Sequence, residues 1–166
     1  MDAPEILVEK MNIEERFEDM FCRYFARNIG DGVQLLKTFD YLDKPTDYIV
    51  VNLSLGASTG REFPRTELTG FNEERAFSAT LNISIVCGRR TVNSKTQIRR
   101  LASIIRALML RGILFKAPEL LALVDEYAGL NPQSFGGIEY SADDDGDVAQ
   151  LQYNFEIHLN EKIFKQ

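Results

Sequence analysis

Side chains that carry out acid–base chemistry are sparse in this chain of 166 residues. The sequence has one histidine, His158, on the polar side of an alternating segment near the end of the chain. A lone histidine on a strand is most often just a surface residue. A surface histidine is the simpler interpretation, so we expect no catalytic residue and no enzyme activity.

Aspartates gather in one place that could bind a metal ion, between Asp143 and Asp147. The run does not alternate its carboxylates and has no distant glutamate, as a calcium-binding EF-hand loop would. Aspartate and glycine favour tight turns on their own, so the run predicts a hairpin turn. With one histidine and no cysteine cluster, we expect no metal site. An enzyme stays an alternative only if this turn gathers a metal.

Two further features suggest chemistry at first sight. Gly56 to Gly60 has the glycine spacing of a phosphate-binding loop, but it lacks the terminal Gly-Lys-Ser/Thr and a following helix. The cysteines, Cys22 and Cys87, have no C-x-x-C spacing, and Cys87 continues the apolar side of its strand. We interpret both as packing residues of a reducing compartment and expect no cofactor.

The composition favours a globular protein that binds other proteins. Hydrophobic residues make up 45% of the chain, and the net charge is -6, which opposes sequence-specific binding to nucleic acid. The first ten residues lack the pattern of a signal peptide, and no apolar run is long enough to cross a bilayer. We therefore expect a single intracellular domain over residues 12–166, preceded by an N-terminal arm over residues 1–11.

Two segments have helical spacing of apolar residues. The first runs from Asn12 to about Asn28, where Asn12 and Glu15 form a capping-box pattern and Gly30 follows as a stop. The second runs from Ser94 to about Arg111, with Gly112 as its expected terminator.

Strict alternation of apolar and polar residues predicts strands with one buried face. The clearest strands are expected at 48–55, 77–87 and 148–159, with a fourth at 135–140, a short edge strand at 33–39 and a short helix at 119–127. The sequence thus predicts an α+β domain, an antiparallel sheet of about four strands with helices packed on one face. A long loop, residues 56–76, would join the first two main strands.

Three groups of residues are candidates for protein binding. Arg99 and Arg106, seven residues apart, project from one side of the second helix. The outward sides of the strands are polar but nearly uncharged, notably at Asn82, Ser84, Gln152 and Asn154. We expect both groups at an oligomer interface, although a solvated helix face is the simpler role for each arginine. The loop mixes charges with apolar anchors, so we expect a partner-binding segment at Arg61, Phe63, Arg65 and Phe71, with simple disorder as the alternative.

The order and texture of these elements resemble the tail terminator or tail completion proteins of tailed bacteriophages, also called head–tail joining or minor tail proteins. The resemblance covers residues 12–160. It rests on the aromatic-rich first helix and on four segments, namely Tyr48-Ile-Val-Val-Asn-Leu, Phe77-Ser-Ala-Thr-Leu-Asn-Ile-Ser-Ile-Val, the polar-capped helix from Ser94, and Gln150-Leu-Gln-Tyr-Asn-Phe-Glu-Ile.

The resemblance implies a structural virion protein in the tail or neck, assembled in the host cytoplasm. Copies of the chain would form a hexameric ring that caps the tail tube and joins it to the head connector, with DNA passing through the ring. Its partners would be itself, the tail tube protein and a head-completion or connector protein, without a membrane. The alternatives are another connector or tail tube component, or a non-viral protein-binding module that forms no ring.

Overall fold

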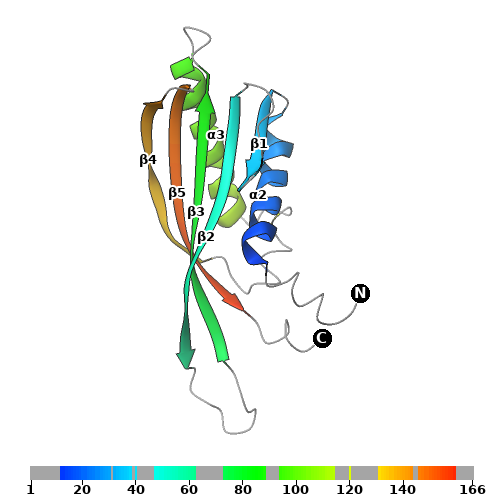
Figure 1. The fold of residues 1–166 in the computed structure, drawn as a ribbon, viewed down its shortest axis with the longest axis vertical. Helices are drawn as coiled ribbons and strands as arrows, with labels where there is room; N and C mark the ends of the chain where they lie inside the picture. The colour runs from blue at the N-terminus through cyan, green and yellow to red at the C-terminus, as the bar shows by residue number, and fades with distance from the viewer. Residues whose placement is uncertain are drawn as a thin grey trace.

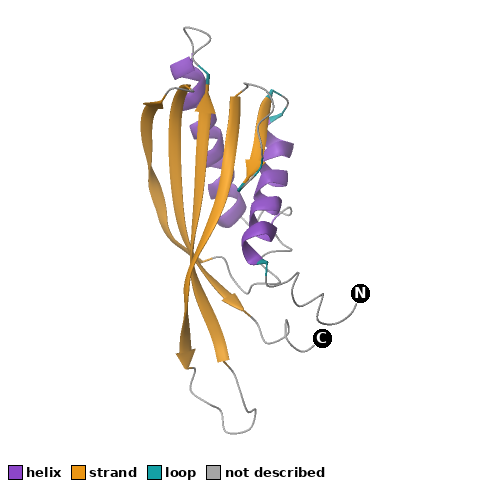
Figure 2. Cartoon of the chain, in the orientation of Figure 1, coloured by secondary structure: helices purple, strands orange, loops and turns teal. Residues whose placement is uncertain are grey.

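The chain folds as a two-layer α+β structure, in which two helices cover one face of a five-stranded sheet (Figures 1 and 2). The computed structural model describes residues 12–30, 32–38, 40, 47–62, 73–88, 94–114, 120, 131–143 and 146–159. Its elements are α2 (Ile13–Ile29), β1 (Val33–Lys37), β2 (Asp47–Glu62), β3 (Glu73–Cys87), α3 (Ser94–Leu114), β4 (Asn131–Asp143) and β5 (Gly146–Leu159). The predicted fold class is confirmed.

The strand order is β1-β2-β3-β5-β4, so β1 and β4 form the two edges. Strands β2, β3, β5 and β4 pair antiparallel, as expected. The edge strand β1 instead pairs parallel with β2, with Val33 opposite Asp47 and Lys37 opposite Val51. The expectation of an antiparallel sheet is wrong for this strand. Alternation with a period of two identifies a half-buried strand but does not give its direction.

Strands β2 and β3 are much longer than the alternating segments that predict them. Their ladder continues past a register shift between Leu55 and Ser58 and reaches Glu62 opposite Glu73. Residues 56–62 and 73–76 of the expected 56–76 loop are therefore strand residues, in a ladder that extends beyond the helices (Figure 1), and residues 63–72 lie outside the described residues. The glycine- and serine-rich stretch that suggests a loop here contains an irregularity of the ladder, and such irregularities let a strand bend and continue.

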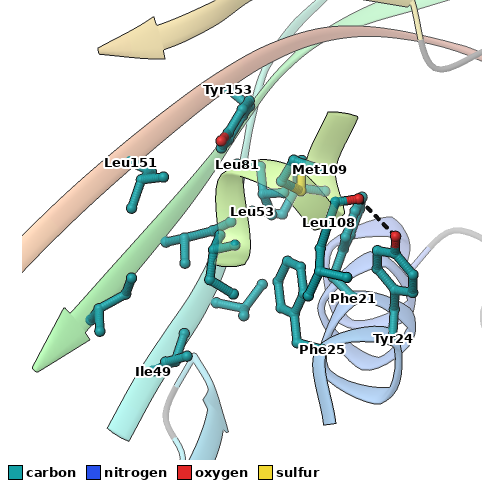
Figure 3. Packing of buried hydrophobic residues seen from close by; sticks show 14 of the residues in the cluster. Phe21, Tyr24, Phe25, Ile49, Leu53, Leu81, Leu108, Met109, Leu151 and Tyr153 are labelled. Atoms are coloured by element: carbon teal, nitrogen blue, oxygen red, sulfur yellow. Dashed lines mark hydrogen bonds between the residues drawn. The ribbon is translucent and has the colours of Figure 1, made fainter. Parts of the chain in front are cut away.

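The core lies between the helices and the inner side of the sheet. On α2, Phe17, Phe21, Tyr24 and Phe25 follow helical spacing and are fully buried, in one cluster with apolar residues of the sheet and of α3. Figure 3 shows Phe21, Tyr24 and Phe25 in this cluster. The Tyr24 hydroxyl donates a 2.7 Å hydrogen bond to the carbonyl oxygen of Leu108 on α3, which ties the two helices together. This bond gives the buried phenol its polar partner.

The ends of the helices follow their sequence signals only in part. Asn12 gives α2 no side-chain capping bond, and its side-chain amide donates to the Glu15 carboxylate at 2.6 Å. Gly30 follows α2 with a φ of 85°, a conformation that suits glycine. Gly112 does not end α3, which continues to Leu114, so that expectation is wrong.

The β4–β5 hairpin is confirmed, with Asp143 opposite Gly146 at its closed end. Strand β4 is longer than the expected 135–140 segment. The expected helix at 119–127 lies outside the described residues except for Leu120, which is buried in the core. The arm over residues 1–11 also lies outside them.

Candidate functional site

The face of the sheet opposite the helices carries rows of neutral polar side chains. Asn52, Asn82 and Gln152 are register partners on β2, β3 and β5, and Ser84 pairs with Gln150 one row away. A third row holds Ser54, Thr80 and Asn154, in which the Thr80 hydroxyl donates to the Asn154 side-chain oxygen at 3.1 Å. These rows define the polar sheet face.

The four residues expected on this face, Asn82, Ser84, Gln152 and Asn154, do come together in the structure. They line one open hollow of about 270 Å³. Glu139 of β4 stands at its margin and is the charged residue among the described residues that line it. Pockets for small molecules are mostly apolar with a few convergent polar groups, whereas six of the eight described residues that line this hollow are polar and only Ile83 and Leu151 are apolar. Its chemistry suits a hydrogen-bonding macromolecular surface.

A second surface runs along the solvent side of α3. Arg99, Ser103, Arg106 and Leu110 are spaced by three or four residues and are all exposed, so they form one stripe. The Arg99 guanidinium lies 5.4 Å from the centre of the Tyr140 ring on β4, which extends the stripe to the edge of the sheet. We call these five residues the α3–β4 surface.

The composition of the α3–β4 surface is unusual for a solvated helix. Leu110 and Tyr140, 39% and 48% exposed, are the large exposed hydrophobic residues among those whose side chains the structure describes. Helix α3 has five basic residues and no acidic one over its 21 residues. No ion pair joins Arg99 or Arg106 to a carboxylate within the described residues. Arginine with exposed aromatic and apolar side chains is typical of protein interfaces.

The two expected parts of the interface lie on opposite faces of the domain. Helix α3 packs on the inner side of β3 and β5, whereas Asn82 and Gln152 point to the outer side of the same strands. Arg99 and Arg106 therefore do not form one patch with the polar residues. An interface that uses both groups must join the helical face of one copy to the polar sheet face of another.

A third surface is an acidic cleft between α2 and the β1 edge, which was not predicted from the sequence. It is lined by Glu14, Glu15, Glu18 and Asp40, with Lys37 as its cation. The Lys37 ammonium lies 2.8 Å from a carboxylate oxygen of Asp19 and 3.8 Å from one of Glu15. The bond to Asp19 is the main reason that the pKa of Lys37 is raised. The glutamates in the first turns of α2 are close together in the sequence, whereas Asp40 is brought near them only in the folded structure.

The partner-binding segment expected in the 56–76 region is only partly described. Arg61 lies in β2 opposite Glu74, within the hairpin ladder. Phe63, Arg65 and Phe71 lie outside the described residues. The backbone of Arg61 is thus held in a strand and not in a loop.

The surroundings of the two cysteine thiols favour a structural role over a chemical one. Burial raises the pKa of the Cys22 and Cys87 thiols to about 12, and for Cys22 the nearby Asp19 carboxylate adds to the effect. Such thiols are poor nucleophiles at neutral pH. Within the described residues, no group of three metal-binding side chains comes together, and no helix has the length and apolarity to span a membrane.

Comparison of the chain with protein-family models and with curated proteins finds no match. What the three surfaces bind must therefore be inferred from their own chemistry. The polar sheet face, the α3–β4 surface and the acidic cleft all have side chains suited to contacts with protein.

Proposed function

We propose that this chain is a structural protein whose copies assemble into a ring, and that the ring caps the tail tube of a tailed bacteriophage and joins it to the head connector. The ring would be a hexamer, as in the tail terminator proteins that the sequence resembles. Its working partners would be the tail tube protein and a head-completion protein.

The observation that carries the proposal is the pair of surfaces on the two faces of one sheet. The α3–β4 surface offers Arg99, Tyr140 and Leu110 on the helical face, and the polar sheet face offers amides and hydroxyls on the other. A contact between unlike surfaces of identical chains is head-to-tail, and it closes into a ring when the rotation between neighbours allows it. Two unlike surfaces thus favour a ring over a symmetric dimer.

A different class of function remains as the alternative. A protein-binding module without a ring would use the same surfaces for a foreign partner and would stay monomeric. Another connector or tail tube component would also assemble, but with a different stoichiometry or as an open stack. The oligomeric state separates these candidates.

The test is native mass spectrometry beside sedimentation velocity on the wild-type chain over a range of concentrations. A ring gives one closed oligomer whose mass stays constant once it has formed. A chain that stays monomeric at high concentration, and also with tail tube protein added, contradicts the proposal. An open series of masses would favour a tube component instead.

Gln152→Arg with Asn82→Arg examines the polar sheet face. Arginines on this face would meet the arginines of the α3–β4 surface of the next copy, so they should weaken assembly, while circular dichroism shows a folded subunit. The matched control is Gln34→Arg, on an exposed position of β1 away from the hollow.

A further inference from the structure

The α3–β4 surface and the acidic cleft lie at opposite edges of the same sheet. Helix α2, which forms the cleft, packs on β1 and β2, whereas α3 packs on β3 and β5 and reaches β4 through the Arg99–Tyr140 contact. The strand order β1-β2-β3-β5-β4 therefore puts the acidic cleft at the β1 edge and the arginines of α3 toward the β4 edge; Figure 1 shows the two edge strands.

We propose that the acidic cleft of one copy receives the α3–β4 surface of the next copy. The carboxylates of Glu14 and Glu15 would pair with Arg99 and Arg106 across this contact. The inference rests on the ring of the proposed function, but it gives the α3–β4 surface a different neighbour, the acidic cleft in place of the polar sheet face. The Asn82 and Gln152 variants test the polar sheet face separately.

Charge complementarity selects this contact over a symmetric one. In a two-fold dimer, a surface that meets its own copy would bring α3 arginines against α3 arginines, and like charges in contact are repulsive. Besides the buried Glu18, the cleft carries the carboxylates of Glu14, Glu15 and Asp40. The closest ion pair of Lys37 is with Asp19, which is not among these three, so the cleft is net negative. A head-to-tail contact pairs these opposite charges at every interface.

Apolar contacts and the edge strand support the same arrangement. Besides its charges, the α3–β4 surface has apolar area at Leu110 and Tyr140 that a contact would bury. Strand β4 has register shifts after Pro132 and after Phe135, and such irregular edges discourage pairing with another strand. The contact at this edge would then be made by side chains and not by strand addition.

Charge reversal tests the pairing directly. Variant A carries Arg99→Glu with Arg106→Glu, and variant B carries Glu14→Lys with Glu15→Lys. Each reversal leaves both surfaces of its own copies with like charge, so each variant alone should associate at least ~30-fold more weakly than wild type. An equimolar mixture of A and B restores opposite charges at every contact and should form a ring with alternating copies. Arg100→Glu is the matched control, on an exposed position of α3 about 100° from the stripe.

The outcomes separate this inference from the proposed function. Loss of the oligomer in A and in B, with recovery in the mixture, supports the pairing. If wild type is a ring and B keeps it, the ring stands and the acidic cleft is the wrong partner. If A and B both dissociate but the mixture stays monomeric, or if the control dissociates as well, the pairing is also wrong. A monomeric wild type overturns both.

Discussion

The carboxylate of Glu18 on α2 accepts a 3.1 Å hydrogen bond from the backbone N–H of Leu53 on β2, just past the point where β1 ends. The same carboxylate accepts bonds from the backbone N–H and the hydroxyl of Thr38, both at 3.0 Å. Glu18 is only 4% exposed and is the buried charged residue among those described. Because β1 has ended at this point, the Glu18 carboxylate accepts the hydrogen bond that a further residue of β1 would have accepted. It thereby satisfies the backbone of β2 at this edge.

Replacing Glu18 should therefore destabilise the fold. Glu18→Ala leaves the buried N–H of Leu53 without an acceptor and should lower the free energy of unfolding by about 2–3 kcal/mol. Glu18→Gln keeps the size but turns one acceptor into a donor, so it should cost less. Urea unfolding followed by circular dichroism measures both. Glu14→Gln, one turn earlier in the helix and less buried, should change stability by less than about 0.5 kcal/mol. Equal losses in the Glu14 and Glu18 variants would contradict the role given to Glu18.

Gly112 permits close packing of the two helices. A Cβ atom at this position would lie 2.7 Å from Cδ1 of Leu120 and 3.2 Å from Cε1 of Tyr24. Gly112→Ala would raise helix propensity by about 1 kcal/mol, yet overpacking should make the net change destabilising by about 1–2 kcal/mol. Adding Leu120→Ala removes the closest contact, so the double variant should lose less than the sum of the single variants in thermal unfolding. A stabilised Gly112→Ala would show that the space is open.

Much of this fold follows from periodicity in the sequence. The spacing of Phe17, Phe21 and Tyr24 identifies the buried side of α2, and the alternation around Asn82 and Gln152 places those residues on the outer face. These patterns are local, because the periods of helices and strands relate each residue only to others a few positions away in the sequence. The hairpin at Gly146 is likewise a local turn signal.

Features that depend on distant partners were not predictable. The parallel direction of β1, the extension of β2 to Glu62 and the buried position of Glu18 each depend on pairing across the sheet. Gly112 carries a standard stop signal, and only the contact with Tyr24 shows why it is a glycine. The candidate site follows the same rule. Arg99 and Arg106 were visible on their helix, whereas Tyr140 joins them only through the fold.

The two thiols should be inert in the folded chain. Burial raises the pKa of Cys22 and Cys87 from 9.0 to about 12, so at pH 8 both stay protonated. Reaction with a thiol-specific disulfide reagent at pH 8 should be at least ~100-fold slower in the native chain than in urea, since each pKa unit changes the thiolate fraction tenfold. Cys87→Ala isolates Cys22, which is the less buried of the two. Fast reaction of that variant in buffer would contradict the prediction.

The same shifts give stability a pH dependence with a defined sign. Between pH 9 and about 12, the folded chain keeps thiol protons that the unfolded chain releases. The folded state therefore binds more protons in this window, and the thiol contribution to stability falls as pH rises above about 9. Cys87→Ala should lose less stability than wild type between pH 8 and pH 10.5 in urea unfolding. Equal losses in the two proteins would show that Cys87 does not contribute.

Tyr140 should matter for assembly more than for folding. Its ring is 48% exposed and supports the Arg99 guanidinium at 5.4 Å, an exposed cation–π contact worth about 0.5–1 kcal/mol. Tyr140→Ala should therefore change the free energy of unfolding by no more than about 1 kcal/mol. In the proposed head-to-tail contact the same ring becomes buried, and truncating such an anchor should weaken association at least ~10-fold.

Tyr140→Phe keeps the ring and should assemble like wild type, and Arg100→Ala serves as the control on α3. On the same samples, sedimentation velocity measures the change in association and urea unfolding measures the change in the free energy of unfolding. If Tyr140→Ala forms the oligomer at wild-type concentrations, Tyr140 is a surface residue that rests on Arg99 and the contact does not include it.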